Sequence, residues 1–177
     1  MLPLGHAAGG YLTGVLLART TPGGAPDSRA LRLFAALGGL LPDIDLVIYQ
    51  ALRKPLNLKR NSHHHTWITH TFPFYLLSGG LLASLAKRAE RIHMQAYITA
   101  VTAGACVHLL QDMFGSGDGI QALYPFTPRL LGFRLLGVHG KEWRRRYVRD
   151  PIFLLEAGLI VAALLHLAGS SRESALR

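Results

Sequence analysis

The chain has 177 residues, of which 50% are hydrophobic and only 16% are charged, and its mean hydropathy is +0.25. Ordinary soluble domains carry roughly 25% charged residues, so this composition argues against a disordered chain and against a purely soluble fold. The 19 Lys and Arg residues outnumber the 10 acidic residues, which predicts an anionic partner, and the apolar runs favour membrane lipid headgroups over nucleic acid.

Five apolar stretches, separated by basic connectors, follow one another along the chain: residues 1–18, 33–52, 66–86, 92–114 and 151–169. Each is close to the roughly 20 residues that a helix needs to cross a bilayer. The sequence shows no strand-like alternation. It therefore predicts an all-α fold, a helical membrane bundle of about five apolar helices. The alternative is a soluble bundle, because Gly, His and Asp interrupt several of the stretches.

The length fits a single domain that covers residues 1–177. Its expected parts are a segment that carries the functional motifs, a basic connector and a C-terminal helix: residues 1–126, 127–150 and 151–169. The connector contains Trp143, Tyr147 and the arginines at 144–146. Aromatic and basic residues together are typical of a membrane-surface anchor, with a phosphate clamp as the alternative.

The distribution of basic residues predicts the orientation in the membrane. If the five stretches alternate across a bilayer, the N-terminus and the connectors 53–65 and 116–150 share one side, which carries 11 Lys and Arg residues. The other side carries 8. Because the more basic side usually faces the cytoplasm, we expect a multi-pass protein of the inner membrane with a cytoplasmic N-terminus.

Under this topology, histidine and aspartate residues from four chain segments gather at the cytoplasmic end of the bundle. They are His6; Asp43 and Asp45; His63, His64, His65 and His70; and His108 and Asp112. Charged residues at membrane depth are costly and normally functional. Imidazole and carboxylate groups together suit zinc, manganese or iron, and we expect zinc first.

The spacing of these residues supports a shared metal site. His108 and Asp112 lie four residues apart, so in a helix both side chains share one face and can hold one ion. Asp43 and Asp45 lie two residues apart and would diverge in a regular helix, but Pro42 interrupts the helix just before them. An irregular turn at this point lets both carboxylates, or one carboxylate and a supporting group, reach one site.

Several of these residues also have simpler interpretations. His65 and His70 converge only if His65 belongs to the connector and His70 to the first turns of the next helix. Asp43 also fits a helix cap. His166 fits a packing residue on an apolar face, and Cys106 fits the filling of a small gap.

The single cysteine excludes a disulfide framework and a Cys-based zinc finger. More than four His and Asp donors indicate an open or dinuclear catalytic site, since structural zinc sites are closed and four-coordinate. A metal-activated water that attacks a phosphorus or carbonyl centre is the chemistry that such a site would support.

Three strings resemble one family: LLPDID at 40–45, HTWITHT at 65–71 and VHLLQDMFGSGDGIQALYPF at 107–126. They are similar to the motifs of the YdjM-like family, which is described as LexA-regulated, membrane-bound, predicted metal-dependent hydrolases. An early His followed by Gly, here His6 and Gly10, belongs to the same pattern. The chain departs from the family where Thr66 replaces an Arg and Thr71 replaces a Ser. We expect His64 or an arginine at 144–146 to replace a phosphate contact by that Arg.

The resemblance implies roles for the clustered residues. The implied metal ligands are His6, Asp45, His65, His70, His108 and Asp112. The implied catalytic residues are Asp43, beside a metal-bound hydroxide, and His64. The alternative role for Asp43, as for His6, is that of an additional ligand or of a residue that orients a ligand. A more distant similarity to zinc-dependent phospholipase C, which orders His and Asp alike on a helical scaffold, points to phosphodiester substrates.

The sequence thus predicts a membrane-bound metal-dependent hydrolase for a phosphoester, with a phospholipid as one candidate. One alternative is a metal-binding membrane protein or transporter without catalysis. Another is a di-iron membrane oxygenase, although such enzymes use several dense histidine boxes and this chain has only one dense cluster.

Overall fold

A computed structural model describes residues 1–20, 27–56, 64–115, 119–133 and 140–175. Its long helices are α1 (Pro3–Thr20), α2 (Ser28–Leu40), α3 (Ile44–Arg53), α4 (Phe72–Arg88), α5 (Ile92–Gly115), α6 (Gly140–Tyr147) and α7 (Pro151–Ala175). Two short 3₁₀ helices, η1 (His64–Thr66) and η2 (Ile68–His70), precede α4. The described residues form no strand, and their only β-contact is an isolated bridge between Ile120 and Leu131. The predicted all-α fold is confirmed.

Local sequence signals explain where the helices begin and end. The Asp27 side chain caps α2 by accepting a hydrogen bond from the Arg29 backbone N–H at 2.8 Å. The Thr71 hydroxyl caps α4 in the same way. The apolar stretch 33–52 was expected to be one helix with a break at Pro42, and it forms two helices, α2 and α3, because a proline lacks the N–H that continues a helix.

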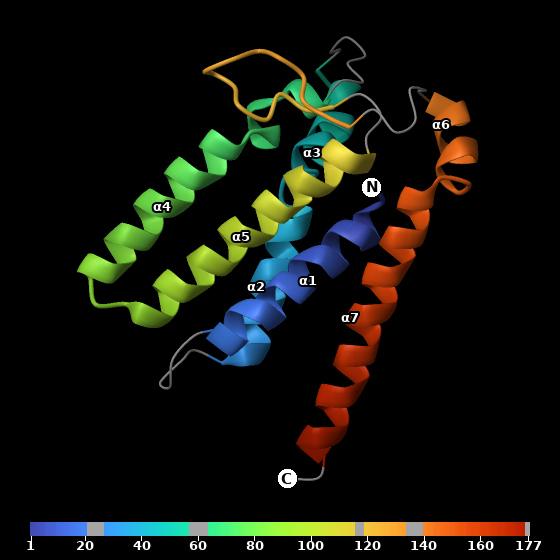
Figure 1. Ribbon diagram of the computed structural model, residues 1–177. Helices are drawn as coiled ribbons and strands as arrows, with labels where there is room; N and C mark the ends of the chain where they lie inside the picture. Colours follow the sequence, from blue (N-terminus) through green and yellow to red (C-terminus); the bar gives the residue numbers. More distant parts are fainter. Residues whose placement is uncertain (21–26, 57–63, 116–118, 134–139, 176–177) are drawn as a thin grey trace.

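The helices run alternately up and down, so that one end of the bundle collects several helix ends (Figure 1). The starts of α1, α4 and α7 lie at the same end as the last turns of α2 and α5. In the centre of the bundle, α1, α2 and α5 pack together. The contact between α2 and α5 is so close that a Cβ atom at Gly104 would overlap the carbonyl oxygen of Ala35. Small residues therefore set the spacing of the helices that carry His6, His108 and Asp112.

Among the described residues, one helix segment, Pro151–Ser170 of α7, is long and apolar enough to cross a bilayer. Its mean hydropathy is 2.1, and only 17% of its most apolar part is buried against the rest of the chain. The helix α4 has 17 residues, fewer than the roughly 20 that a crossing needs, and buried polar side chains such as Gln111 lower the hydropathy of α5. The expectation of about five spanning helices stays a prediction.

Leucine side chains nevertheless cover the outside of the bundle. On α4, Leu77 is 69% exposed and Leu81 is 62% exposed, and on α7 Leu154 is 72% exposed. Exposed apolar surface on this scale is typical of a protein that meets lipid or another protein.

Candidate metal centre

Four parts of the fold bring the predicted residues to one end of the bundle (Figure 1). His6 lies near the start of α1, Asp43 lies in the turn between α2 and α3, and Asp45 lies in the first turn of α3. The 3₁₀ segments before α4 supply His65 and His70, and the last turns of α5 supply His108 and Asp112. His6, His70, His108 and Asp112 are each at most 2% exposed.

The Asp112 carboxylate lies at the centre of the cluster. Its Oδ2 is 3.0 Å from His108 Nε2 and 3.8 Å from His65 Nε2. It is also 3.9 Å from His70 Nε2, and Oδ1 lies 3.2 Å from His6 Nε2. The Met1 amino group also lies 3.2 Å from Oδ1. Four imidazole rings from three parts of the chain therefore present the same nitrogen, Nε2, to one carboxylate.

Asp43 forms the second carboxylate of the cluster. Its Oδ1 lies 3.7 Å from His70 Nε2 and 3.8 Å from His108 Nε2. Asp43 occupies the N-cap position of α3, but its side chain makes no capping hydrogen bond. The geometry therefore favours the site over the helix cap as the role of Asp43.

The donor atoms form two groups of three: His6, Asp43 and His108, and His65, His70 and Asp112. Within each group, the candidate ligand atoms lie within 4.8 Å of one another. Ligand atoms about 2.1 Å from a tetrahedral zinc ion are roughly 3.4 Å apart. The donor atoms of each group could therefore reach one ion with only small shifts of their side chains.

Hydrogen bonds on the far side of two rings fix how these rings face the cluster. His108 Nδ1 lies 2.8 Å from the Gly39 carbonyl oxygen, and His6 Nδ1 lies 3.1 Å from Gln111 Oε1. Gln111 in turn donates from Nε2 to the Gly5 carbonyl at 3.0 Å, which leaves its oxygen to accept from His6. Since an oxygen acceptor requires the proton on Nδ1, Nε2 of a neutral ring carries the lone pair that a metal would use.

Asp45 lies behind His70 rather than beside the Nε2 atoms. Its Oδ2 is 3.5 Å from His70 Nδ1 and accepts a hydrogen bond from the Thr69 hydroxyl. A carboxylate on the far nitrogen of a ligating histidine orients the ring and makes it a better ligand. The two aspartates predicted from the LLPDID motif thus face opposite nitrogens of one imidazole.

The negative charge of the neighbouring aspartates raises the pKa of His70. Burial of the ring disfavours the charged form, but Asp43 and Asp45 outweigh this effect and raise the pKa of His70 from 6.5 to about 9. A ring in this environment holds a proton at neutral pH.

The other residues predicted from the sequence lie elsewhere. The His64 side chain falls outside the described residues, as do His63 and His139. His166 accepts or donates a hydrogen bond with the Tyr11 hydroxyl at 2.9 Å, away from the cluster, and His93 is exposed. The interpretation of His166 as a packing residue agrees with this contact.

The sequence did not predict the roles of Gln111 and Gly39 as hydrogen-bond partners of His6 and His108. The sequence offered one signal for Gln111: it is a polar residue directly before Asp112 in a mostly apolar helix. Gly39 carried none, because it acts through a backbone carbonyl whose partner depends on the packing of α2 against α5.

The YdjM inner membrane protein family matches residues 1–175, nearly the whole chain and all of the elements that build the cluster. The chain belongs to the YdjM family. It is therefore an inner membrane protein, as the family description states, and the resemblance seen in three sequence strings is confirmed. No curated protein and no solved structure matches the chain. The family match establishes the membrane location, while the cytoplasmic orientation stays a prediction.

Proposed function

We propose that this YdjM-family protein is a metal-dependent hydrolase that cleaves phosphoester bonds in membrane-borne substrates such as phospholipids. The observation that carries the proposal is the donor set: four imidazole Nε2 atoms face the carboxylates of Asp112 and Asp43 at one end of the bundle. Nitrogen and carboxylate donors in this number suit zinc, with manganese and iron as close alternatives.

Two buried atoms that lack an aligned hydrogen bond among the described residues support the proposal that a cation binds in the cluster. His108 Nε2 and Asp112 Oδ2 are 3.0 Å apart, yet neither has an aligned hydrogen bond within the described part of the chain. Leaving a buried polar atom unsatisfied costs about 1–3 kcal/mol. A divalent cation would satisfy the lone pairs of both atoms at once, so the residues present fit this group.

The two donor groups support two neighbouring cation positions. In this arrangement His6, Asp43 and His108 hold one ion, and His65, His70 and Asp112 hold the other. Asp45 is a positioning residue that acts through His70, and Gln111 is a positioning residue that acts through His6. This assignment moves Asp45 from the expected ligand set to a supporting position, and it gives Asp43 a ligand oxygen in addition to the catalytic role expected from the sequence.

The exposure of the carboxylates indicates where water and substrate approach. The side chain of Asp43 is 25% exposed, that of Asp45 is 12% exposed and that of Asp112 is 3% exposed. A bound divalent cation would lower the pKa of a coordinated water toward neutrality and so supply a nucleophile. Asp43 lies on the open side, where a carboxylate oxygen can accept the proton of that water, while the fixed rings of His6 and His108 keep their Nε2 atoms in place.

The exposed side chains of a neighbouring loop support the proposal that the substrate lies in the membrane. Residues 119–133 cover the segment before α4: the Gln121 backbone N–H donates to the His65 carbonyl at 3.2 Å. The loop exposes large apolar side chains, with Phe126 79% exposed, Phe133 57% exposed and Leu130 50% exposed. Aromatic and aliphatic side chains beside a site favour contact with the lipid interface, so the loop would bring the cluster to the headgroups.

The test is hydrolysis by the full-length protein purified in detergent, with a soluble phosphodiester and with phospholipid in mixed micelles. We expect turnover that requires added zinc or manganese, and that falls at least 100-fold in Asp43→Asn. His93→Ala is the matched control, because it removes an exposed histidine outside the cluster. A metal-loaded protein that hydrolyses neither substrate contradicts the proposal. Metal uptake into vesicles by that inert protein would instead favour the transporter alternative.

A further inference from the structure

A pocket lies at the end of the bundle opposite the metal centre. It has a volume of about 550 Å³ and is lined by Tyr11, Arg29, Arg32, Leu33, Ala36, Leu167 and Ser170. The arginines come from the first turns of α2, far from Gly39 at the other end of that helix, and Ser170 comes from the last turns of α7. The pocket therefore shares no residue with the metal centre.

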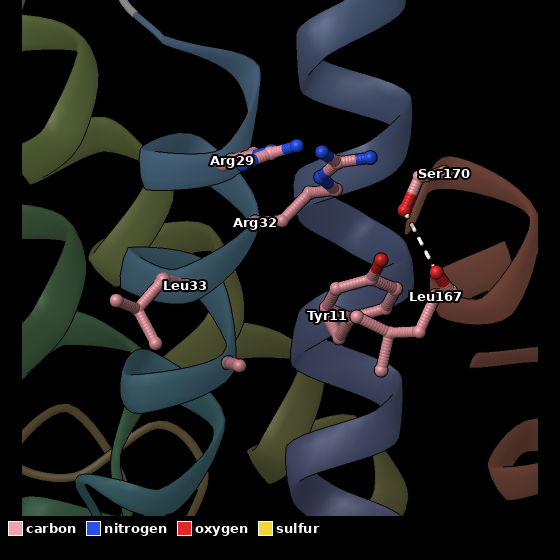
Figure 2. A pocket seen from close by; sticks show the side chains of 7 residues that line it. Tyr11, Arg29, Arg32, Leu33, Leu167 and Ser170 are labelled. Atoms are coloured by element: carbon pink, nitrogen blue, oxygen red, sulfur yellow. Dashed lines mark hydrogen bonds between the residues drawn. The ribbon is translucent and has the colours of Figure 1, made fainter. Parts of the chain in front are cut away.

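One side of the pocket carries two arginines and the hydroxyl groups of Tyr11 and Ser170. Arg29 and Arg32 are three residues apart on α2, so their side chains share one face, and Figure 2 shows both guanidinium groups beside the gap between α2 and α7. Ser170 lies across the gap, where its hydroxyl donates to the Leu167 carbonyl at 3.0 Å. Two guanidinium groups with nearby hydroxyls are suited to the oxygens of a phosphate, and no described residue that lines the pocket is acidic.

The other side of the pocket is apolar. Leu33 on α2 is 59% exposed and Leu167 on α7 is 44% exposed, and both line the pocket together with Ala36. Exposed leucines continue this surface along both helices, with Leu37 49% exposed and Leu164 59% exposed. A ligand that matches both sides has an anionic head and a hydrocarbon tail.

The position along α7 gives the depth of the pocket in the membrane. The segment of α7 that can cross a bilayer ends at Ser170, and Ser170 lines the pocket. Residues at the end of a membrane span lie at headgroup level, whereas Leu164, nearly two turns earlier, lies at the level of the acyl chains. The basic side of the pocket therefore lies at headgroup level.

We propose that this pocket binds an anionic phospholipid, with the headgroup phosphate between Arg29 and Arg32 and one acyl chain along Leu33 and Leu167. The pocket is independent of the proposed hydrolytic site and lies at the opposite end of α7. A bound lipid would bridge α2 and α7, which meet the same ligand from the two sides of the gap.

The experiment measures thermal unfolding of the full-length, delipidated protein in detergent with added phosphatidylglycerol. At about 100 times the dissociation constant, the lipid should raise Tm of the wild type by roughly 5–10 °C. In the double variant Arg29→Gln/Arg32→Gln we expect at least tenfold weaker binding, which at the same lipid concentration reduces this shift to about half or less. The matched control Lys87→Gln/Arg88→Gln removes the same charge from the end of α4, and should keep the shift.

Two control ligands identify which part of the lipid is bound, and a second variant tests the pocket if the double arginine variant does not fold. Glycerol phosphate at the same concentration tests a free phosphate group, and phosphatidylcholine tests a zwitterionic lipid; we expect neither to raise Tm. Ala36→Phe fills the pocket without a change in charge and should abolish the phosphatidylglycerol shift even if the double arginine variant does not fold. An equal shift in Ala36→Phe and the wild type, or in the charge control and the double variant, contradicts the proposal. An equal response to glycerol phosphate contradicts its lipid part.

Discussion

His108 Nε2 lies 3.0 Å from Asp112 Oδ2, and the two atoms face each other without an aligned hydrogen bond. The two residues occupy successive turns of α5, where a spacing of four places both side chains on one face. The Gly39 carbonyl holds the opposite nitrogen of the His108 ring at 2.8 Å, so the ring is fixed from α2 while its lone pair faces the carboxylate. This relationship is the basis of the predictions that follow.

Gly39→Ala should disrupt the cluster from outside its ligand set. A Cβ atom at this position would overlap the His6 carbonyl oxygen and would press α1 away from α2. We expect destabilisation by about 1–3 kcal/mol and weaker metal binding, measured by chemical unfolding and by metal titration. The control is Gly80→Ala on α4, where a Cβ atom meets nothing within 4 Å and the change should be neutral or stabilising. Equal behaviour of the two variants would show that the helix contact does not position His6.

Gln111→Leu should weaken metal binding while the fold persists. The substitution removes the acceptor for His6 Nδ1 and leaves the His6 ring without its orienting partner. Loss of such a supporting contact typically lowers metal affinity about 10–100-fold. Gln95→Leu makes the same chemical change in the first turn of α5 and should leave the affinity unchanged. Wild-type affinity in Gln111→Leu would contradict the positioning role.

The two aspartates of the LLPDID motif should differ in their effects. Asp43→Asn removes a donor that faces His70 and His108, so we expect loss of bound metal and of hydrolysis. Asp45→Asn removes a partner of the far nitrogen of His70, so we expect about 10–100-fold weaker metal binding with activity restored at high metal concentration. Kinetics as a function of metal concentration separate the two cases. If Asp45→Asn loses more metal and activity than Asp43→Asn, Asp45 rather than Asp43 is the metal ligand.

The stability of the metal-free protein should fall as the pH rises from about 6.5 to 9. His70 has a pKa of about 9 in the folded chain and an ordinary value of 6.5, so the folded state binds the proton more tightly. This contribution, at most about 3 kcal/mol, is fully present below pH 6.5 and is lost as the pH rises through 9. Chemical unfolding in the presence of a chelator measures this slope, and His70→Gln should flatten it. Metal binding competes with the same proton, so added zinc should stabilise the protein more at pH 9 than at pH 6.5.

The sequence predicted much of the fold because apolar runs and turn residues act locally. The stretches at 92–114 and 151–169 correspond to α5 and α7, which begin at Ile92 and Pro151. The stretch at 66–86 begins as a helix only at Phe72, since Pro73 and the Thr71 cap favour a start there. The helix α6 lies in the part expected to be a connector, because most of its eight residues are charged and only apolar stretches were expected to form helices.

The sequence also predicted which residues gather in the cluster, but not how their roles divide. Helix direction alone places His6, His70, His108 and Asp112 at one end of the bundle. The difference between Asp43 and Asp45 depends on the turn after Pro42, which points the two carboxylates at different nitrogens of His70. Such a difference follows from three-dimensional packing and has no counterpart in residue spacing.

The most direct test of the metal centre is the metal content of the purified full-length protein. We expect one to two equivalents of zinc, manganese or iron in the wild type and in His93→Ala. The variants His108→Ala and Asp112→Ala should lose this metal, because each removes a donor from the buried centre of the cluster. Only trace metal in the wild type, or wild-type metal content in both variants, would contradict the account.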